Sequence, residues 1–173
     1  MECIQAIKGR RSIRRFKDIP ISRDMINQLL NAAQMAPSAG NIQARDFIIV
    51  SEKRLREQLA KAAFGQSFIE QAPIDIVVIA NIERSSVRYG KRGELYAIQD
   101  ATASIMNILL MAYSIGMGSC WVGAFDEDAI RILLGLHLIN IRPIAIIPIG
   151  YPDETPITPP RLDLYKLTHL EMW

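Results

Sequence analysis

The chain has 173 residues and a mass of 19.5 kDa, and half of its residues are hydrophobic. A chain of this length and composition can bury a core without disulfides, so we expect one domain spanning residues 1–173. The two cysteines, Cys3 and Cys120, lie far apart without a CxxC partner or a histidine cluster, which argues against a disulfide framework and a zinc site. We therefore expect a reducing, cytoplasmic setting and no bound metal.

The positive charge is concentrated at the start of the chain. Residues 1–17 carry six Lys/Arg and one Glu, whereas the other 156 residues carry 14 basic and 17 acidic side chains. A nucleic-acid surface usually spreads its charge over a face and interleaves aromatic residues, so this local cluster favours one small anion and no nucleic-acid partner. The alternative is a solvated helix end. The charged stretch 8–17 also stands where a secretory signal would have its apolar segment, so we expect no such signal.

Two helices are predicted before residue 40. The first covers residues 3–8 and leads into the stretch "RRSIRRF" at 10–16. The second begins at Ser22, a good N-cap, and ends before Pro37. Its apolar positions Ile26, Leu29, Leu30 and Ala33 recur at helical spacing, which predicts one buried face.

The next segment reads as strand, helix, strand and loop. Residues 47–51 and 75–81 are short, β-branched and apolar, so both are predicted strands buried on both faces, with a charged helix between them from 53 to 63. Residues 83–93, "ERSSVRYGKRG", are polar and rich in charge. They predict a surface loop or a mobile lid.

A long helix is predicted near residues 94–115, because apolar residues recur from Ile98 to Ala112 at helical spacing. The uncharged stretch 101–125 allows a transmembrane reading. However, several Ser, Thr and Asn side chains dilute this stretch and "GMG" at 116–118 interrupts it, so we expect a central or interface helix and no membrane contact. A strand at 118–124, a helix at 126–136, a strand at 142–152 and a proline-rich tail complete the chain, without an internal repeat or linker.

The arginine stretch has the chemistry of a phosphate site. Asp18 and the prolines after it stop a helix, so Arg10, Ser12 and Arg14 are expected on an extended segment where alternate side chains point the same way. Guanidinium groups match phosphate oxygens with paired hydrogen bonds, and a hydroxyl adds another donor. The loop "APSAGNIQARDF" at 36–47 adds small residues and two side-chain amides that can contact a flat ring; alternatively, it is an ordinary helix-to-strand loop.

Four stretches in order resemble the nitroreductase family of FMN-dependent oxidoreductases: "RRSIRRF", "MAPSAGNIQARDFIIV", "GMGSCWVGAFDEDAIRILLGL" and "RPIAIIPIGYPDETP". The resemblance extends from residue 8 to about residue 161. It implies an α+β fold with a central, mainly antiparallel sheet flanked by helices. It also implies an intertwined homodimer with two FMN sites in the subunit interface, and the uncharged helix near 94–115 would form the core of that interface.

The resemblance also implies the FMN contacts. The family's flavin-binding stretch is matched by Arg10, Arg11, Ser12 and Arg14, with Arg10 and Ser12 toward the phosphate and Arg14 able to reach the pyrimidine edge of the ring. Arg161 matches a further phosphate-binding residue. The loop contributed by the partner subunit is matched by Pro37, Ser38, Ala39, Asn41 and Gln43, and the backbone that packs against the ring and donates toward its N5 is matched by Val122 and Gly123.

The physical reading agrees with this transfer. Reduction places negative charge on one edge of the flavin, so a fixed cation such as Arg14 stabilises the reduced form. Such an enzyme needs no catalytic acid, base or nucleophile of its own, and none is expected here. His137 and His169 are interpreted as structural or surface residues, and Cys120 as a packing residue.

The chain departs from the family's longer members at two points. Val122 stands where they have an acidic residue, and their extra helices over the flavin are missing here. We therefore expect an open pocket, or one covered only by residues 83–96. The middle part of the chain, near Phe64 to Phe68, does not reveal which residues would contact the flavin.

The leading functional hypothesis is an oxidoreductase that uses NADH or NADPH and FMN to reduce a small oxidant, such as a nitroaromatic or a quinone, in a ping-pong order. Two alternatives remain open at this point. One is a reductive dehalogenase or a flavin-modifying enzyme of the same fold. The other is a flavin-binding or anion-binding module without catalytic turnover.

Overall fold

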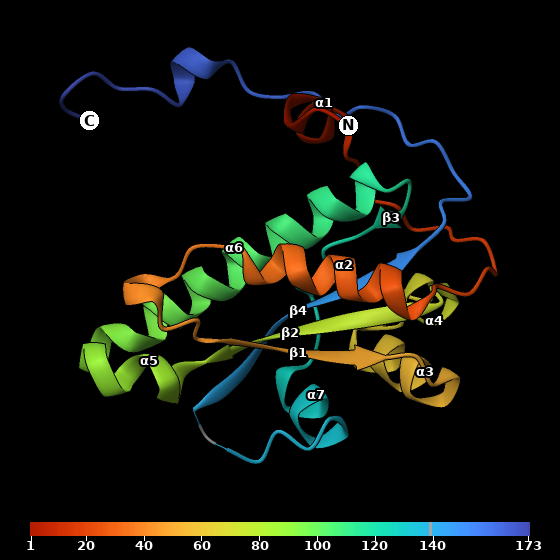
Figure 1. Cartoon of the computed structure of the whole chain (residues 1–173), viewed down its shortest axis with the longest axis horizontal. Coiled ribbons are helices and arrows are strands. Elements are labelled where there is room, and N and C mark those ends of the chain that lie inside the picture. Colours follow the sequence, from red (N-terminus) through yellow and green to blue (C-terminus); the bar gives the residue numbers. More distant parts are fainter. Residues whose placement is uncertain (139) are drawn as a thin grey trace.

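The computed structural model describes residues 1–138 and 140–173, which form helices packed on both faces of one sheet (Figure 1). The sheet contains four strands: β1 (Arg45–Val50), β2 (Ile74–Asn81), β3 (Gly118–Ser119) and β4 (Ile141–Gly150). The α-helices are α1 (Cys3–Gly9), α2 (Arg23–Gln34), α3 (Lys53–Ala62), α4 (Phe68–Gln71), α5 (Ile82–Tyr89), α6 (Gly93–Ser114) and α7 (Glu127–Leu133). Three short 3₁₀ helices are η1 (Ala39–Asn41), η2 (Gly90–Arg92) and η3 (Leu164–Lys166).

The strands lie in the order β1-β2-β4-β3, and every neighbouring pair is antiparallel. In the centre, Ile76 of β2 lies opposite Ile49 of β1 and Ile147 of β4. This arrangement confirms the predicted α+β fold with an antiparallel central sheet.

The alternation of side chains along β2 and β4 divides the core between two layers of helices. Ile76 and Val78 of β2, with Ile147 of β4, pack toward α2 and α6. Their sequence neighbours Val77 and Ile146 belong instead to the core shared with α3 and α7. Because both faces of these strands are covered, β2 and β4 read as continuous apolar runs.

Helix α6 is the central helix that the apolar spacing predicts. Its inward stripe, including Ala101, Ile105 and Ile108, is completely buried. The stretch Ile82–Ser114 has the length and hydropathy that a membrane-crossing helix needs, but the core helix of a soluble protein has the same composition. In this fold, α6 packs against both α2 and the sheet.

Three sequence-based expectations are corrected. Residues 83–93 are not a loop: they form α5 and η2, because the Asn81 side chain caps α5 by accepting from the amide of Arg84 at 3.0 Å. Gly93 lets α5 and α6 pack closely, since a Cβ there would lie 2.5 Å from Cα of Ser86.

The two strand corrections concern burial and length. The four middle residues of β1 are only partly buried, because β1 is an edge strand of the sheet. The strand expected at 118–124 is limited to Gly118–Ser119, with one further bridge from Val122 to Ile146.

The C-terminal tail runs along the top of the molecule, past α1, and ends away from the sheet and its helices (Figure 1). Residues 157–173 are all exposed. The large hydrophobic side chains among them are Ile157, Leu162, Leu164, Tyr165, Leu167, Leu170, Met172 and Trp173. The single chain therefore leaves a long apolar segment uncovered, which is typical of an interaction surface.

Asp75 is a fully buried carboxyl in the centre of the sheet. It lies opposite Val50 of β1 and Pro148 of β4, and neither of its oxygens has a hydrogen-bond partner among the described residues. Burial raises the pKa of Asp75 well above its usual value, although the charge of Arg56 opposes the shift. The native fold thus favours the protonated form.

We expect the protonation of Asp75 to affect how the free energy of unfolding depends on pH. A folded-state pKa above the unfolded value contributes stability that is complete below the unfolded-state pKa and is lost as pH rises through the folded-state pKa. The free energy of unfolding of the wild type should therefore fall relative to that of Asp75→Asn as the pH rises above about 4, the ordinary pKa of an aspartate in the unfolded chain. Urea denaturation at a series of pH values measures this difference, and parallel curves for the two proteins would contradict it.

Candidate functional site

The predicted phosphate-binding residues meet in one cavity. Arg10, Arg11, Ser12 and Arg14 line a cavity of about 360 Å³ together with Arg161, which the tail brings back against the start of the chain. The segment is held in place by pairing of Ser12 with Ser119 and by the amide of Ile13, which donates to the Ser119 carbonyl at 3.0 Å. Residues about 150 positions apart thus form a single basic pocket.

The cations of this pocket lack acidic partners. No Asp or Glu oxygen lies within 4 Å of the side-chain nitrogens of Arg10, Arg14 or Arg161 in the parts of the chain that the structure describes. Burial lowers the pKa of Arg10, and the nearby charges of Arg11 and Arg161 lower it further. A bound anion would relieve both effects, so the pocket has the electrostatics of a phosphate site.

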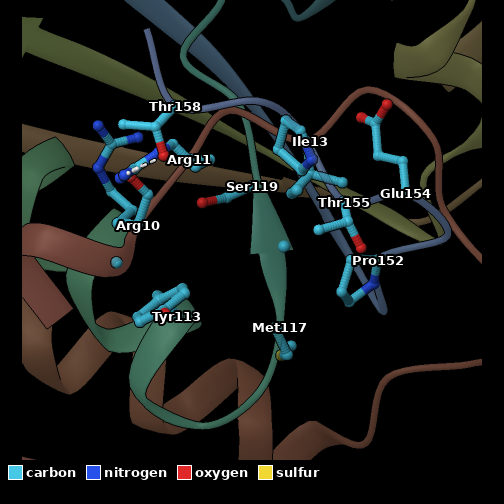
Figure 2. A pocket seen from close by; sticks show the side chains of 13 residues that line it. Arg10, Arg11, Ile13, Tyr113, Met117, Ser119, Pro152, Glu154, Thr155 and Thr158 are labelled. Atoms are coloured by element: carbon cyan, nitrogen blue, oxygen red, sulfur yellow. Dashed lines mark hydrogen bonds between the residues drawn. The ribbon is translucent and has the colours of Figure 1, made fainter. Parts of the chain in front are cut away.

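Arg11 has a structural task in addition to its place in the cavity. Its guanidinium donates to the carbonyls of Lys8 and Arg10 at 2.7 and 2.8 Å and to the hydroxyl of Thr158 at 2.9 Å (Figure 2). These bonds tie the tail to the end of α1. Arg15, in contrast, does not line the cavity.

Arg14 lies beside a residue that the sequence left unplaced. Its guanidinium carbon is 5.9 Å from the ring centroid of Phe68, and the Glu154 carboxylate accepts from the backbone amides of Arg14 and Arg15. The middle of the chain therefore reaches the site through Phe68. The stacking orients the cation without neutralising it.

A second cavity, of about 280 Å³, adjoins the first at Arg10 and Arg11 (Figure 2). Tyr113 and Met117 from the end of α6 and the turn that follows form part of its apolar lining, and Ser119 adds a hydroxyl. Gly9 is required beside Tyr113, because any Cβ at this position would overlap the tyrosine ring.

Cys120 lies next to the arginine pocket but is buried. Burial raises the pKa of its thiol, and the charges of Arg14 and Arg10 and a hydrogen bond with Ser12 oppose this only in part. A thiolate is the reactive form, so this cysteine is held in its unreactive state. The interpretation of Cys120 as a packing residue agrees with this geometry.

The predicted contact loop at 37–43 lies at the other end of α6. Pro37 and Ser38 precede η1, which contains Ala39 and Asn41, and Gln43 follows it. The Ser38 hydroxyl accepts from the Gln43 amide at 3.0 Å, so the loop closes on itself.

Two buried charged side chains that the sequence reading missed hold this loop. Asp100 of α6 accepts from the amides of Ala39 at 3.0 Å and Ala44 at 3.2 Å. Arg45 donates to the carbonyls of Gln34, Ala36 and Pro37. The sequence signal for Asp100 is a charged residue on the apolar face of a predicted helix. This signal becomes informative only when the structure shows which face of α6 is buried.

Val122 and Gly123 form a third group. The amide of Val122 donates to the carbonyl of Ile146 at 3.0 Å and so is already used within the sheet. Gly123 lines a separate cavity of about 260 Å³ with Phe125 and Arg142. Of the two predicted backbone donors, only Gly123 retains an amide without an acceptor among the described residues.

The single chain does not bring the arginine pocket and the 37–43 loop together. Tyr113, beside the arginine pocket, and Asp100, beside the loop, are 13 positions apart on one straight helix, or about 20 Å at 1.5 Å per residue. The arginine pocket and the 37–43 loop therefore lie toward opposite ends of α6 (Figure 1). The cavity that contains Arg10, Arg14 and Arg161 is lined by no residue of the 37–43 loop.

Comparisons with known proteins agree on one family. The family model described as "Nitroreductase family" matches residues 7–69 and 63–151. A NADH dehydrogenase of Thermus thermophilus is 31% identical over 91% of this chain and 90% of its own.

Among solved structures, an FMN-dependent nitroreductase from Clostridium difficile has a TM-score of 0.83 and 31% identity, covering 98% of this chain and 99% of its own. The NADPH:FMN oxidoreductase of Vibrio harveyi, solved in complex with NAD⁺, has a TM-score of 0.92 and 26% identity, covering 99% of this chain and 77% of its own.

We expect Asp100→Ala to release the 37–44 loop. The substitution leaves the buried amide of Ala44 and the partly buried amide of Ala39 without acceptors, and hydrogen bonds to a charged group contribute about 1.5–3 kcal/mol each. Urea denaturation should show a loss of at least about 1.5 kcal/mol, and hydrogen exchange should show faster exchange at Ala39 and Ala44. Asp24→Ala removes an exposed carboxylate from α2 and serves as the control. Unchanged exchange at both amides in Asp100→Ala would refute the assignment.

Proposed function

The chain belongs to the nitroreductase family, and we propose that its 173 residues form one FMN-binding domain of an NAD(P)H-dependent flavin oxidoreductase. The observation that carries the proposal is the basic pocket of Arg10, Ser12, Arg14 and Arg161, which has no acidic partner among the described residues. Similarity to an FMN-dependent nitroreductase and to an NADPH:FMN oxidoreductase supports the choice of cofactor and electron donor.

The residues present fit the phosphate end of FMN. Arg10 and Arg161 face the same cavity, and burial together with the repulsion of Arg11 and Arg161 lowers the pKa of Arg10, so a dianionic phosphate is the complementary ligand. The Ser12 hydroxyl offers a further donor in the same cavity. The Arg14 cation, stacked on Phe68, stabilises negative charge that develops on a ring placed next to it.

Bound FMN supplies the redox chemistry, a two-electron transfer from a reduced nicotinamide to a small oxidant such as a nitroaromatic or a quinone. The protein contributes binding, orientation and electrostatics. Cys120 is kept as a buried thiol, and His137 and His169 are exposed and outside the cavity. Donor and oxidant share one open site in this proposal, so we propose that they bind in turn, in a ping-pong order.

We propose that the active form is a homodimer in which the 37–43 loop of one subunit completes the arginine pocket of the other. The separation of the two groups along α6 supports this arrangement. The exposed apolar tail and the half-exposed Ile4 and Ile7 of α1 supply surface for such an interface. We also propose a cytoplasmic location, in line with two free cysteines.

The first test is the FMN affinity of Arg10→Ala. Loss of a charge-assisted contact to phosphate should weaken binding by about 1–3 kcal/mol, or about 5- to 150-fold. Titration of flavin absorbance or fluorescence measures the affinity, and Arg15→Ala is the control because Arg15 is exposed and does not line the cavity. The wild-type flavin bands should bleach when NADH or NADPH is added without oxygen. Full FMN affinity in Arg10→Ala would show that the pocket serves another anion.

The second test is the oligomeric state. We expect the wild type to sediment at twice the 19.5 kDa of one chain. Leu164→Asp combined with Leu167→Asp places two charges on the exposed apolar tail and should shift the protein to monomers with reduced FMN occupancy.

Ile132→Asp is the matched control, since Ile132 is equally exposed but lies on α7, away from the tail. A monomeric wild type that binds FMN fully would contradict the shared site.

A further inference from the structure

A cluster of two tyrosines and three basic residues lies where α5 meets α6. It consists of Arg88, Tyr89, Lys91, Arg92 and Tyr96, and is called the tyrosine–arginine cluster below. The rings of Tyr89 and Tyr96 pack edge to face with their centroids 4.8 Å apart. Arg88 and Arg92 lie 5.6 and 5.2 Å from the centroids of Tyr89 and Tyr96, and the Arg92 Nε donates to the Tyr96 hydroxyl at 2.9 Å.

The cations of the cluster are oriented but not neutralised. No Asp or Glu oxygen lies within 4 Å of the charged nitrogens of Arg88, Lys91 or Arg92 within residues 1–138 and 140–173. Glu94, on the first turn of α6, pairs instead with Arg142 at 3.6 Å. Arg84, on the same helix as Arg88, pairs with Asp46 at 2.7 Å. Aromatic faces thus hold two guanidinium groups whose charge is left for a further anion.

The cluster is attached to the 37–43 loop. Gly40 has a φ of +55°, and a Cβ there would lie 2.9 Å from Nη1 of Arg88 and would also contact the Tyr89 hydroxyl. Arg84 donates to the carbonyls of Gln43 and Arg45 at 2.7 and 3.1 Å, which joins α5 to the other end of the loop. The cluster therefore stands directly behind the loop that we propose to contact the flavin.

We propose that the tyrosine–arginine cluster binds a phosphate group of the nicotinamide dinucleotide donor. This inference rests on the proposed function, because it places the donor's phosphates beside the flavin-contacting loop. A dinucleotide that presents its nicotinamide to a flavin extends its pyrophosphate and adenosine away from the ring. Arg88 and Arg92 offer planar forks that match phosphate oxygens in pairs, and Lys91 adds a point charge.

The tyrosines give the cluster a second chemical property. Their rings restrict the guanidinium groups before a ligand arrives, so less side-chain entropy is lost on binding. This separates the cluster from an ordinary solvated helix face, where long basic side chains are free to reorient.

The test measures donor binding directly. Flavin-loaded wild type, Arg88→Ala and Arg92→Ala are titrated by calorimetry with NADP⁺ and with NAD⁺, and the KM values of NADPH, NADH and the oxidant are determined in parallel. We expect roughly tenfold weaker dinucleotide binding in each variant. Tyr96→Phe keeps the ring and removes the hydroxyl that accepts from Arg92, so its effect should be smaller but in the same direction. Arg54→Ala, an exposed arginine of α3, is the control.

Each outcome decides the assignment. Weaker binding of NADP⁺ alone supports contact with the 2′-phosphate, and equal weakening of both dinucleotides supports contact with the pyrophosphate that they share. Affinities that match the Arg54→Ala control overturn the proposal, as does a change confined to the KM of the oxidant.

The absorbance of FMN in each variant reports the proposed function separately. Loss of flavin from the wild type would overturn the FMN site, whereas retained flavin with unchanged dinucleotide affinity would overturn only the cluster.

Discussion

The packing of α6 against the sheet and α2 is the constraint on which the rest of the structure depends. This helix carries a fully buried apolar stripe, and each end of it supports a different half of the candidate site. Tyr113 borders the cavity beside the arginine segment, whereas Asp100 accepts from the amides of the 37–44 loop. Because a buried helix of this length is rigid, the two halves are held apart within one chain. The fold therefore places the arginine pocket and the 37–43 loop toward opposite ends of α6 and leaves an exposed apolar tail.

The arginine side chains at both ends of α6 share one electrostatic feature. Arg10, Arg14 and Arg161 meet around one cavity, and Arg88 and Arg92 lie beside the loop, without carboxylate partners within ion-pair distance in the described parts of the chain. Other charges are used by the structure itself: Asp100 and Arg45 are buried and hydrogen bonded to backbone. The protein thus separates charges that build the scaffold from charges that remain available to anions.

Sequence patterns and structure agree best where a pattern is local. The helix from Ser22 to Pro37 forms as expected because Ser22 caps it, with its hydroxyl accepting from the Met25 amide at 3.3 Å. They differ at residues 83–93, where charge and glycine predict a loop. A polar composition does not distinguish a loop from an amphipathic surface helix, and packing of Gly93 against Ser86 stabilises the helix there.

By itself, the sequence predicted the central helix from its apolar spacing, and its resemblance to the nitroreductase family implied the antiparallel α+β class and the phosphate-binding arginines, because spacing, caps and ordered motifs are properties of neighbouring residues. Only the tertiary structure decided that Phe68 stacks on Arg14 and that Asp100 and Arg45 hold the loop. Those contacts join residues far apart in the chain. Their existence depends on the register of strands and the rotation of α6, and these are set by burial of the whole core rather than by any short stretch.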